Sequence, residues 1–461
     1  MAADASWWPE LARLNASAAS AEDAAAPDLA IGGLPELPRL LTREPRSILV
    51  EGDGRRVLHR AGYRVSTYVA LSSPDRLRLV LAAEHREAAA YGVRTRIVPA
   101  SSLKRLRRDV AARLLERGIV PPRLPLVTVG QRHLAPPFLV AAAQEELGIQ
   151  HLGWFLVPGA GDALSRGAFF LFPPRETLPS WALKFPRVRG YDAPFRREEQ
   201  ALRRARAVGP IVERHAPEQL AQLDVGGFAA SIESAAPGSR LDSILSGPGD
   251  RRAKVALVER VAEWVVELAA ASRAPAERLG PEWRRLVELA ARAEHALGVP
   301  IPLPEAPFFE PVLQHNDLGA WNVVVGDDGF VVVDWESSER YGAPLWDLLY
   351  FLVHVLSQLA GSRQDNLDQY LRRLLRGEDE WSRLLFRWTR RAAADLGIPS
   401  SRIGTLATLC WLHHSKSRPR REAALADFGA GGDALALLTE RLPVVWFDDD
   451  GLGPSWPALE G

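Results

Sequence analysis

The sequence predicts an α+β fold in which a β-rich part precedes a larger helical part, with a further α/β region at the N-terminus. Strand-like segments surround two turn-rich loops, one near residue 160 and one near residue 327. Val258, Val261, Val265 and Leu268 recur on one face of a helix in the C-terminal half. Strand-like and helix-like segments also alternate between residues 31 and 136.

Length and composition limit the class of protein. A chain of 461 residues is long enough for two or three domains, and 47% hydrophobic with 25% charged residues is ordinary for a soluble protein. The 57 basic and 57 acidic residues give no overall field that would draw nucleic acid or an anionic membrane. No apolar run approaches the ~20 residues of a membrane span, and residues 1–30 lack a secretion signal. We expect a cytoplasmic protein.

The N-terminal part divides into two regions. Residues 1–30 are rich in Ala, Ser and Asp without periodicity, which predicts a disordered tail. Residues 31–136 form an accessory region of unassigned role, with strands expected at Ser47–Glu51 and Tyr63–Leu71 and an Arg-rich helix at Leu103–Arg117. The stretch 61–74 faintly resembles the last strands of a small-molecule methyltransferase. No glycine-rich loop for a methyl donor follows a strand, so methyl transfer is not predicted.

The most informative segment is a β-hairpin with polar residues at both ends. The apolar stretches Val323–Val325 and Phe330–Val333 flank four turn-forming residues, Gly326 to Gly329. Asn322 opens the first strand and Asp334 closes the second. Facing residues of an antiparallel pair lie about 5 Å apart at Cβ, so one divalent ion could contact both side chains.

The loop before this hairpin supplies a third functional group. Asp317 lies five residues before Asn322, where it could accept a proton from a hydroxyl that attacks a phosphate. Phosphoryl transfer needs positioned reactants and positive charge, which comes largely from Mg²⁺, and Mg²⁺ prefers oxygen ligands. The pattern predicts a magnesium-dependent phosphoryl-transfer centre. The alternative is a hairpin whose polar edges have no shared role.

The residues that carry a wider resemblance are His315, Asp317, Trp321, Asn322, Asp334, Trp335 and the segment Gly342–Leu348. They resemble the aminoglycoside phosphotransferase and choline kinase family, which has a protein-kinase-like fold of two lobes. The resemblance implies Asp317 as the catalytic base and Asn322 and Asp334 as magnesium ligands. It also implies that His315 and a buried Asp347 support the loop, although a helix cap is the alternative for Asp347.

The same resemblance implies a β-rich nucleotide lobe at residues 137–237 and a helical, acceptor-binding lobe at residues 238–461. One departure is visible, because Asn316 stands where the family most often has glycine.

The expected nucleotide lobe has two candidate phosphate-binding features. Strands at His151–Val157 and Ala168–Phe172 flank a loop with Gly159 and Gly161, whose backbone amides could approach phosphates. The next strand contains Lys184. Arginine is the default cation of this chain, since only four residues are lysines, and a compact ammonium suits the α- and β-phosphates of ATP. The alternative is a lysine that protects a sheet edge.

Two further residues are expected near the nucleotide. The helix predicted at Phe195–Ala207 offers Glu198 as the partner of that lysine, with Glu199 as the alternative. A hinge is expected near Glu233, where backbone groups between residues 232 and 235 would hold adenine.

These residues predict an ATP- and Mg²⁺-dependent kinase that phosphorylates a hydroxyl of a small molecule. The alternative is a nucleotide-binding pseudokinase that regulates a partner through the N-terminal region. A pseudokinase is expected to lack Lys184, Asp317, Asn322 or Asp334, and all four are present. A protein substrate is less favoured, because Asp347 follows only thirteen positions after Asp334.

The acceptor is expected to be neutral, such as a sugar. A polycationic aminoglycoside needs several convergent carboxylates, and the helical lobe offers only the runs at residues 378–380 and 448–450. Trp381, Phe386, Trp388 and Trp411 could stack on a sugar or pack in the core. Trp321 and Trp335 could supply a cation–π wall for choline. An aminoglycoside kinase or choline kinase proper is therefore less favoured.

Overall fold

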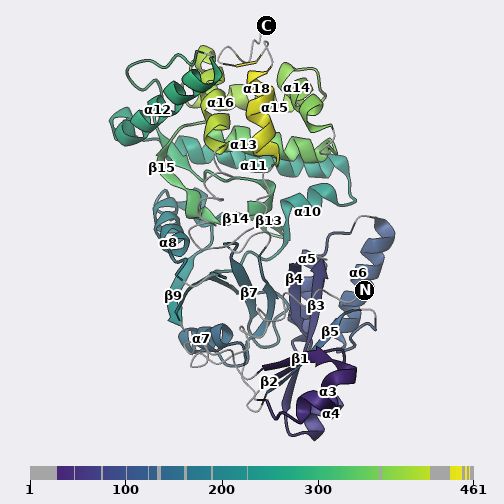
Figure 1. Ribbon diagram of the computed structural model, residues 1–461. Helices are drawn as coiled ribbons and strands as arrows, with labels where there is room; N and C mark the ends of the chain where they lie inside the picture. The colour runs from purple at the N-terminus through teal and green to yellow at the C-terminus, as the bar shows by residue number, and fades with distance from the viewer. Residues whose placement is uncertain are drawn as a thin grey trace. The chain divides into compact units, whose positions relative to one another are not determined.

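The computed structural model describes residues 29–45, 47–73, 76–99, 101–122, 124–131, 136–159, 164–187, 190–225, 227–298, 300–362, 366–415, 437–448, 452–453 and 456. The chain forms two compact units (Figure 1). Unit 1 contains the chain up to Phe195 and the segment Glu218–Gly238, and unit 2 contains Arg196–Pro217 and the chain from Ser239. Unit 1 is built on a sheet and unit 2 mainly on helices, which confirms the predicted α+β class. Of the predicted tail, only Leu29 and Ala30 lie within the described residues.

Unit 1 contains a ten-stranded sheet with the order β1-β2-β5-β3-β4-β6-β7-β8-β10-β9. Its strands are β1 (Leu29–Gly33), β2 (Ser47–Glu51), β3 (Arg64–Ser73), β4 (Arg76–Ala82), β5 (Leu126–Gln131), β6 (Gly153–Val157), β7 (Gly167–Phe172), β8 (Trp181–Phe185), β9 (Gln219–Val225) and β10 (Phe228–Ser234). Among the described strands of this sheet, only β1 and β2 pair in parallel. The strands of residues 31–136 join those of the expected nucleotide lobe where Leu81 on β4 pairs with Phe155 on β6.

Helices cover both faces of this sheet. They are α3 (Leu37–Leu41), α4 (Arg55–Arg60), α5 (Arg86–Arg96), α6 (Ser102–Glu116) and α7 (Phe138–Leu147). Successive residues of β6 point to opposite faces, so that Phe155 packs in a cluster with α5 and α6 while Trp154 and Leu156 pack in a cluster with α7. Alternate apolar residues along the strands therefore pack into two separate apolar layers, one on each face of the sheet.

Unit 2 is mainly helical. Its helices are α9 (Pro210–Glu213), α10 (Leu241–Ser246), α11 (Arg251–Ala271), α12 (Gly280–Leu297), α13 (Trp346–Leu359), α14 (Leu367–Arg376), α15 (Ser382–Asp395), α16 (Ser400–His414) and α18 (Leu437–Phe447), and α8 (Ala193–Arg206) enters it from unit 1. Small sheets are formed by β11 (Ser239–Arg240), β13 (Val323–Gly326) and β14 (Gly329–Val332), and by β12 (Val312–Gln314) and β15 (Glu339–Gly342).

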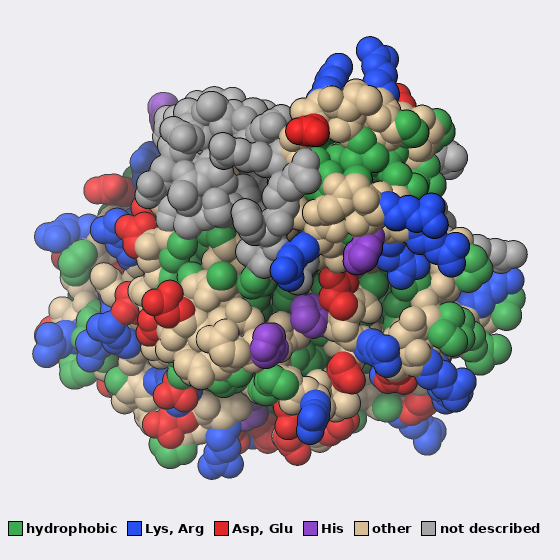
Figure 2. All heavy atoms as spheres, turned by 90° about the horizontal axis from the view of Figure 1, so that it is seen from below, with side chains coloured by type: hydrophobic (Ala, Val, Ile, Leu, Met, Phe, Trp, Pro, Cys, Tyr) green, Lys and Arg blue, Asp and Glu red, His purple; other side chains and the backbone are tan. Residues whose placement is uncertain are grey.

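The core of unit 2 surrounds α13, most of whose residues are buried. The apolar face predicted around Val258 and Leu268 is buried in the same core, which confirms that expectation. No described helix is both long enough and apolar enough to cross a membrane. On the face drawn in Figure 2, acidic and basic side chains are interspersed with apolar ones.

Candidate active site

The loop between β12 and the short helix η4 (Ala320–Asn322) is held by the side chain of His315. The Nε2 atom of His315 lies 2.9 Å from the carbonyl oxygen of Val333, and Nδ1 accepts a hydrogen bond from the Asp317 amide at 3.3 Å. This pattern assigns the proton to Nε2 of a neutral imidazole. His315 therefore links the loop that carries Asp317 to the end of β14.

Asp317 is held by two neighbouring side chains. The Nδ2 atom of Asn322 donates to Asp317 Oδ2 at 3.1 Å and to the Asp317 carbonyl oxygen at 2.9 Å. The hydroxyl of Tyr350 lies 3.4 Å from Oδ1. The pKa of Asp317 is raised to about 7, first by burial and then by the charge of Asp334, while the hydrogen bond from Asn322 opposes the shift. A carboxyl group with such a pKa is suited to exchange protons near neutral pH.

The hairpin places Asn322 and Asp334 at its open end, with a register that differs from the expected one. The backbone carbonyl oxygen of Asn322 accepts a hydrogen bond from the Val333 amide at 2.8 Å. Asn322 therefore faces Val333 and not Asp334. Asp334 follows one residue later in a left-handed conformation, with φ of 63°. This conformation is uncommon for a non-glycine residue and often occurs at functional sites.

The donor set suits magnesium. Because Asn322 donates through Nδ2, its Oδ1 atom is the amide oxygen that can bind a cation, and Asp334 adds a carboxylate. Within the described part of the chain, no three His, Cys, Asp or Glu side chains gather into a metal site. Mg²⁺ commonly takes one or two carboxylates and completes its shell with phosphates and water. A cation here would also offset the repulsion between Asp317 and Asp334.

Asp347 lies in the first turn of α13, and its carboxylate accepts two backbone hydrogen bonds from the loop. The amide of His315 donates to Oδ2 at 2.6 Å and the amide of Asn316 donates to Oδ1 at 2.8 Å. Burial raises the pKa of Asp347 to about 6, and the two hydrogen bonds oppose that shift. The side chain thus satisfies loop amides, and α13 shows no side-chain cap at its N-cap residue, Leu345.

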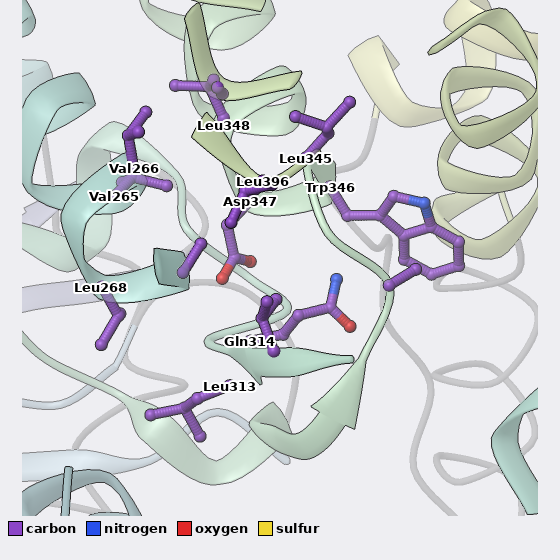
Figure 3. Close-up of a pocket in the computed structure, with 14 residues that line it drawn as sticks. Val265, Val266, Leu268, Leu313, Gln314, Leu345, Trp346, Asp347, Leu348 and Leu396 are labelled. Atoms are coloured by element: carbon purple, nitrogen blue, oxygen red, sulfur yellow. The ribbon is translucent and has the colours of Figure 1, made fainter. Parts of the chain in front are cut away.

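Close to Asp347, Figure 3 shows a cavity of about 20 Å³ that Gln314 and Asp347 line together with apolar side chains. Such a volume is about that of one water molecule. Among the described residues, the Nε2 atom of the buried Gln314 has no hydrogen-bond partner. A Cβ at Gly342 would lie 1.7 Å from Gln314 Oε1, so any larger residue there would displace the Gln314 side chain.

The departure at Asn316 has a backbone explanation. Its φ is 67°, a left-handed conformation that glycine adopts readily and asparagine tolerates better than other residues. We expect Asn316→Gly to leave the free energy of unfolding within about 1 kcal/mol, because the buried Oδ1 of Asn316 has no partner to lose. Asn316→Val should lower the free energy of unfolding by about 2 kcal/mol or more, because a branched side chain disfavours the left-handed conformation. Urea unfolding measures both, and equal stabilities would contradict a left-handed requirement.

A cluster of rings beside Asp317 was not predicted from the sequence. It consists of Trp321, Tyr350, His354 and His414. The Tyr350 ring lies 4.0 Å from His414 and 4.3 Å from His354 between centroids, and Trp321 lies 5.0 Å from His354. The sequence contained a signal for this cluster: Asp347, Tyr350 and His354 have the spacing i, i+3, i+7 on a helix whose other residues from Trp346 to Leu356 are apolar.

His354 should make the stability of unit 2 sensitive to acid. Burial lowers its pKa to about 4, and its Nδ1 lies 2.8 Å from the Tyr350 carbonyl oxygen. In the unfolded chain a histidine titrates near pH 6.5, so the unfolded state binds a proton first as the pH falls. We expect this residue to lower the free energy of unfolding by up to about 3 kcal/mol as the pH falls from 6.5 to 4. In His354→Gln, this part of the pH dependence should disappear from urea unfolding curves, and an unchanged slope would contradict the prediction.

Lys184 is buried on β8 in unit 1, where it pairs with Glu233 of β10. The Nζ atom of Lys184 lies 2.7 Å from Glu233 Oε1. Lys184 faces Ser231 across the antiparallel pair, so Glu233 is its diagonal neighbour on the same face. The sequence predicted a hinge near Glu233. In the structure, the Glu233 carboxylate pairs with Lys184.

The glycine-rich loop follows β6. Gly159 has φ of 95°, and a Cβ there would lie 2.5 Å from the carbonyl oxygen of Arg166, so this position requires glycine. Gly161 lies outside the described residues. Glu198 is buried on α8 in unit 2, whereas Glu199 pairs with Arg203. Glu198 as the partner of Lys184 stays a prediction.

The loop and the hairpin lie in a part of the chain that matches a family of phosphotransferases. Residues 160–387 match the model of the phosphotransferase enzyme family known as APH, and this part of the chain belongs to that family. The match spans most of the nucleotide-lobe strands, the loop with Asp317 and the helix with Asp347.

Several solved structures are also similar to this chain. A provisionally assigned aminoglycoside phosphotransferase from Ralstonia eutropha JMP134 is 14% identical over 67% of this chain and 94% of its own, with a TM-score of 0.41. The amicoumacin kinase hAmiN, solved with AMP-PNP, Ca²⁺ and Ami, is 11% identical over 63% of this chain and 91% of its own, with a TM-score of 0.34. WbdD, solved with the kinase inhibitor LY294002, is 14% identical over 82% of this chain and 70% of its own, with a TM-score of 0.27. No curated protein sequence matches this chain significantly.

Proposed function

We propose that this protein is an ATP- and Mg²⁺-dependent kinase that transfers the γ-phosphoryl group to a hydroxyl of a neutral small molecule, such as a sugar. The observation that carries the proposal is the buried carboxylate of Asp317, which Asn322 orients beside Asp334. Lys184 and the loop at Gly159 are the proposed contacts of the nucleotide phosphates. A kinase of this kind would work in the cytoplasm, where ATP is abundant.

The proposed roles follow from the contacts. Asp317 accepts the proton of the acceptor hydroxyl, whose oxygen forms a bond to the γ-phosphorus while the bond to the β-phosphate oxygen breaks. Asn322 and Tyr350 hold the Asp317 carboxylate, and Asp347 fixes the backbone of the loop. When bound, magnesium would be held by Asn322 and Asp334 and would supply the positive charge that the transfer requires.

The acidic run in the helical lobe supports a neutral acceptor. Asp379 pairs with Arg373 at 3.3 Å, and Glu380 pairs with Arg251 at 2.5 Å. Carboxylates already paired with arginines are poor sites for a polycation, because the ammonium groups would need unpaired partners. Of the terminal run, Asp448 pairs with Arg372 at 2.6 Å, and residues 449 and 450 lie outside the described residues.

Most of the aromatic residues considered for the acceptor site are buried and cannot contact an acceptor. Trp335, Trp381, Phe386, Trp388 and Trp411 are buried in the core of unit 2, so core packing explains them. Trp321 is partly exposed and belongs to the ring cluster beside Asp317. A ring face can stack on the flat face of a sugar, and the polar edges of Tyr and His can hydrogen-bond to sugar hydroxyls. We propose this cluster as part of the acceptor site.

An ADP-release assay on a panel of sugars, choline and kanamycin-type aminoglycosides tests the acceptor. We expect magnesium-dependent ADP release with at least one sugar and little with the aminoglycosides. Glu336, whose charge contributes to the raised pKa of Asp317, is the nearby residue that would favour a cationic acceptor. Efficient turnover of an aminoglycoside with inert sugars would contradict the neutral acceptor. Nucleotide binding without turnover on any compound would favour the pseudokinase alternative.

A further inference from the structure

The helix α6 in unit 1 presents an apolar stripe that no described element covers. Leu103, Leu106 and Val110 are 59%, 60% and 45% exposed. With about 3.6 residues per turn, these three positions share one face of the helix. Ala112 and Leu115 on the opposite face are buried in the cluster that α6 forms with α5, which Figure 1 draws beside it. The stripe therefore faces away from the core of unit 1.

The stripe continues past the C-terminus of α6. Gly118 adopts φ of 73° and ends the helix, and its amide donates to the Leu115 carbonyl oxygen at 2.8 Å. The amide of Ile119 donates to the Leu114 carbonyl oxygen at 2.9 Å. This pair of bonds is the Schellman arrangement, which places the residue after the glycine back along the helix. Ile119 is 52% exposed and lengthens the apolar stripe.

Basic residues accompany the stripe. The helix carries Lys104, Arg105, Arg107, Arg108 and Arg113. Its two acids are engaged with arginines, Asp109 with Arg108 at 2.8 Å and Glu116 with Arg94 at 2.5 Å. At helical spacing, Arg107 and Arg113 lie on either side of the apolar stripe. Although the whole chain has equal numbers of basic and acidic residues, the surface of α6 is locally positive.

We propose that α6 binds the surface of an anionic lipid bilayer, with its apolar stripe among the head groups and acyl chains and its arginines on the lipid phosphates. An apolar face flanked by Lys and Arg is the composition of helices that lie in the membrane interface. The positive charge complements the negative cytoplasmic leaflet. A second copy of the chain would present the same cations in a symmetric contact, and like charges would oppose that pairing.

Vesicle flotation with the full-length protein tests this proposal. The probes are vesicles of phosphatidylcholine alone and of phosphatidylcholine mixed with phosphatidylglycerol. We expect the protein to float with the anionic vesicles and not with the neutral ones, and to detach at high salt because exposed charges are screened. The double variant Leu103→Ser, Leu106→Ser should lower the partition coefficient by at least ~10-fold. The double variant Arg107→Glu, Arg113→Glu should abolish the preference for anionic lipid.

The matched control is Leu178→Ser, which removes a leucine of similar exposure, 52%, outside α6 and should float like the wild type. Thermal melts of all variants should coincide, since every substituted side chain is on the surface. Failure to bind anionic vesicles, or equal flotation of the double serine variant, would overturn the proposal. A loss of self-association in sedimentation velocity for that variant, without lipid binding, would assign the stripe to a second copy instead.

Discussion

Replacing Asp317 by asparagine is expected to reduce turnover by at least ~10²-fold, the low end for positioned proton transfer. Asparagine has nearly the same shape and can still accept a hydrogen bond from Asn322, so the loop should keep its structure. It cannot take the proton of the acceptor hydroxyl. Because Asp317 lies beside the proposed metal ligands and is not one of them, nucleotide affinity should change by only several fold. Steady-state kinetics and nucleotide titration measure the two effects.

The control for this variant is Asp327→Asn in the turn of the same hairpin. Asp327 is exposed, and the turn lies at the far end of β13 and β14 from Asp334. Its substitution should leave turnover unchanged. Near-normal turnover of Asp317→Asn on the true acceptor would remove Asp317 from the role of base.

Replacing Lys184 by methionine is expected to lower the free energy of unfolding of the nucleotide-free protein by about 3 to 5 kcal/mol. The reason is the buried pair with Glu233, whose carboxylate would lose the cation that lies 2.7 Å away. Use of ATP should fall in the same variant. Urea unfolding and kinetics at saturating magnesium give the two measurements.

A second variant separates the structural role of Lys184 from its proposed role at the phosphates. Lys184→Met combined with Glu233→Leu removes both charges, and replacing a buried ion pair by apolar residues is often neutral or stabilising. We expect the double variant to recover much of the lost stability while ATP use stays low. Recovery of both would show that Lys184 serves only to compensate Glu233.

Local patterns in the sequence predicted much of the fold. The strands at Ser47–Glu51 and Trp181–Phe185 have the predicted bounds, and the hairpin turn lies at Gly326 to Gly329 as expected. The helix predicted at Leu103–Arg117 runs from Ser102 to Glu116. These elements depend on short-range periodicity and turn residues, which a single sequence displays directly.

The parts that could not be predicted depend on distant residues. The pairing of β4 with β6 joins segments about seventy-five residues apart, so no local pattern reports it. The contact between Lys184 and Glu233 likewise follows from strand register. The hairpin error had a local cause instead: the two-residue turn between Gly326 and Gly329 sets a register in which Asn322 faces Val333, one residue before Asp334. The exposed stripe of α6 could not be recognised either, because burial is a tertiary property.

The measurement that tests the central claim most directly is mass spectrometry of a metabolite extract incubated with the protein, ATP and magnesium. The account predicts that a neutral hydroxylated compound gains one phosphate, and that the gain disappears with a chelator or with Asp317→Asn. An extract in which the protein binds ATP but no compound gains phosphate would contradict a small-molecule kinase.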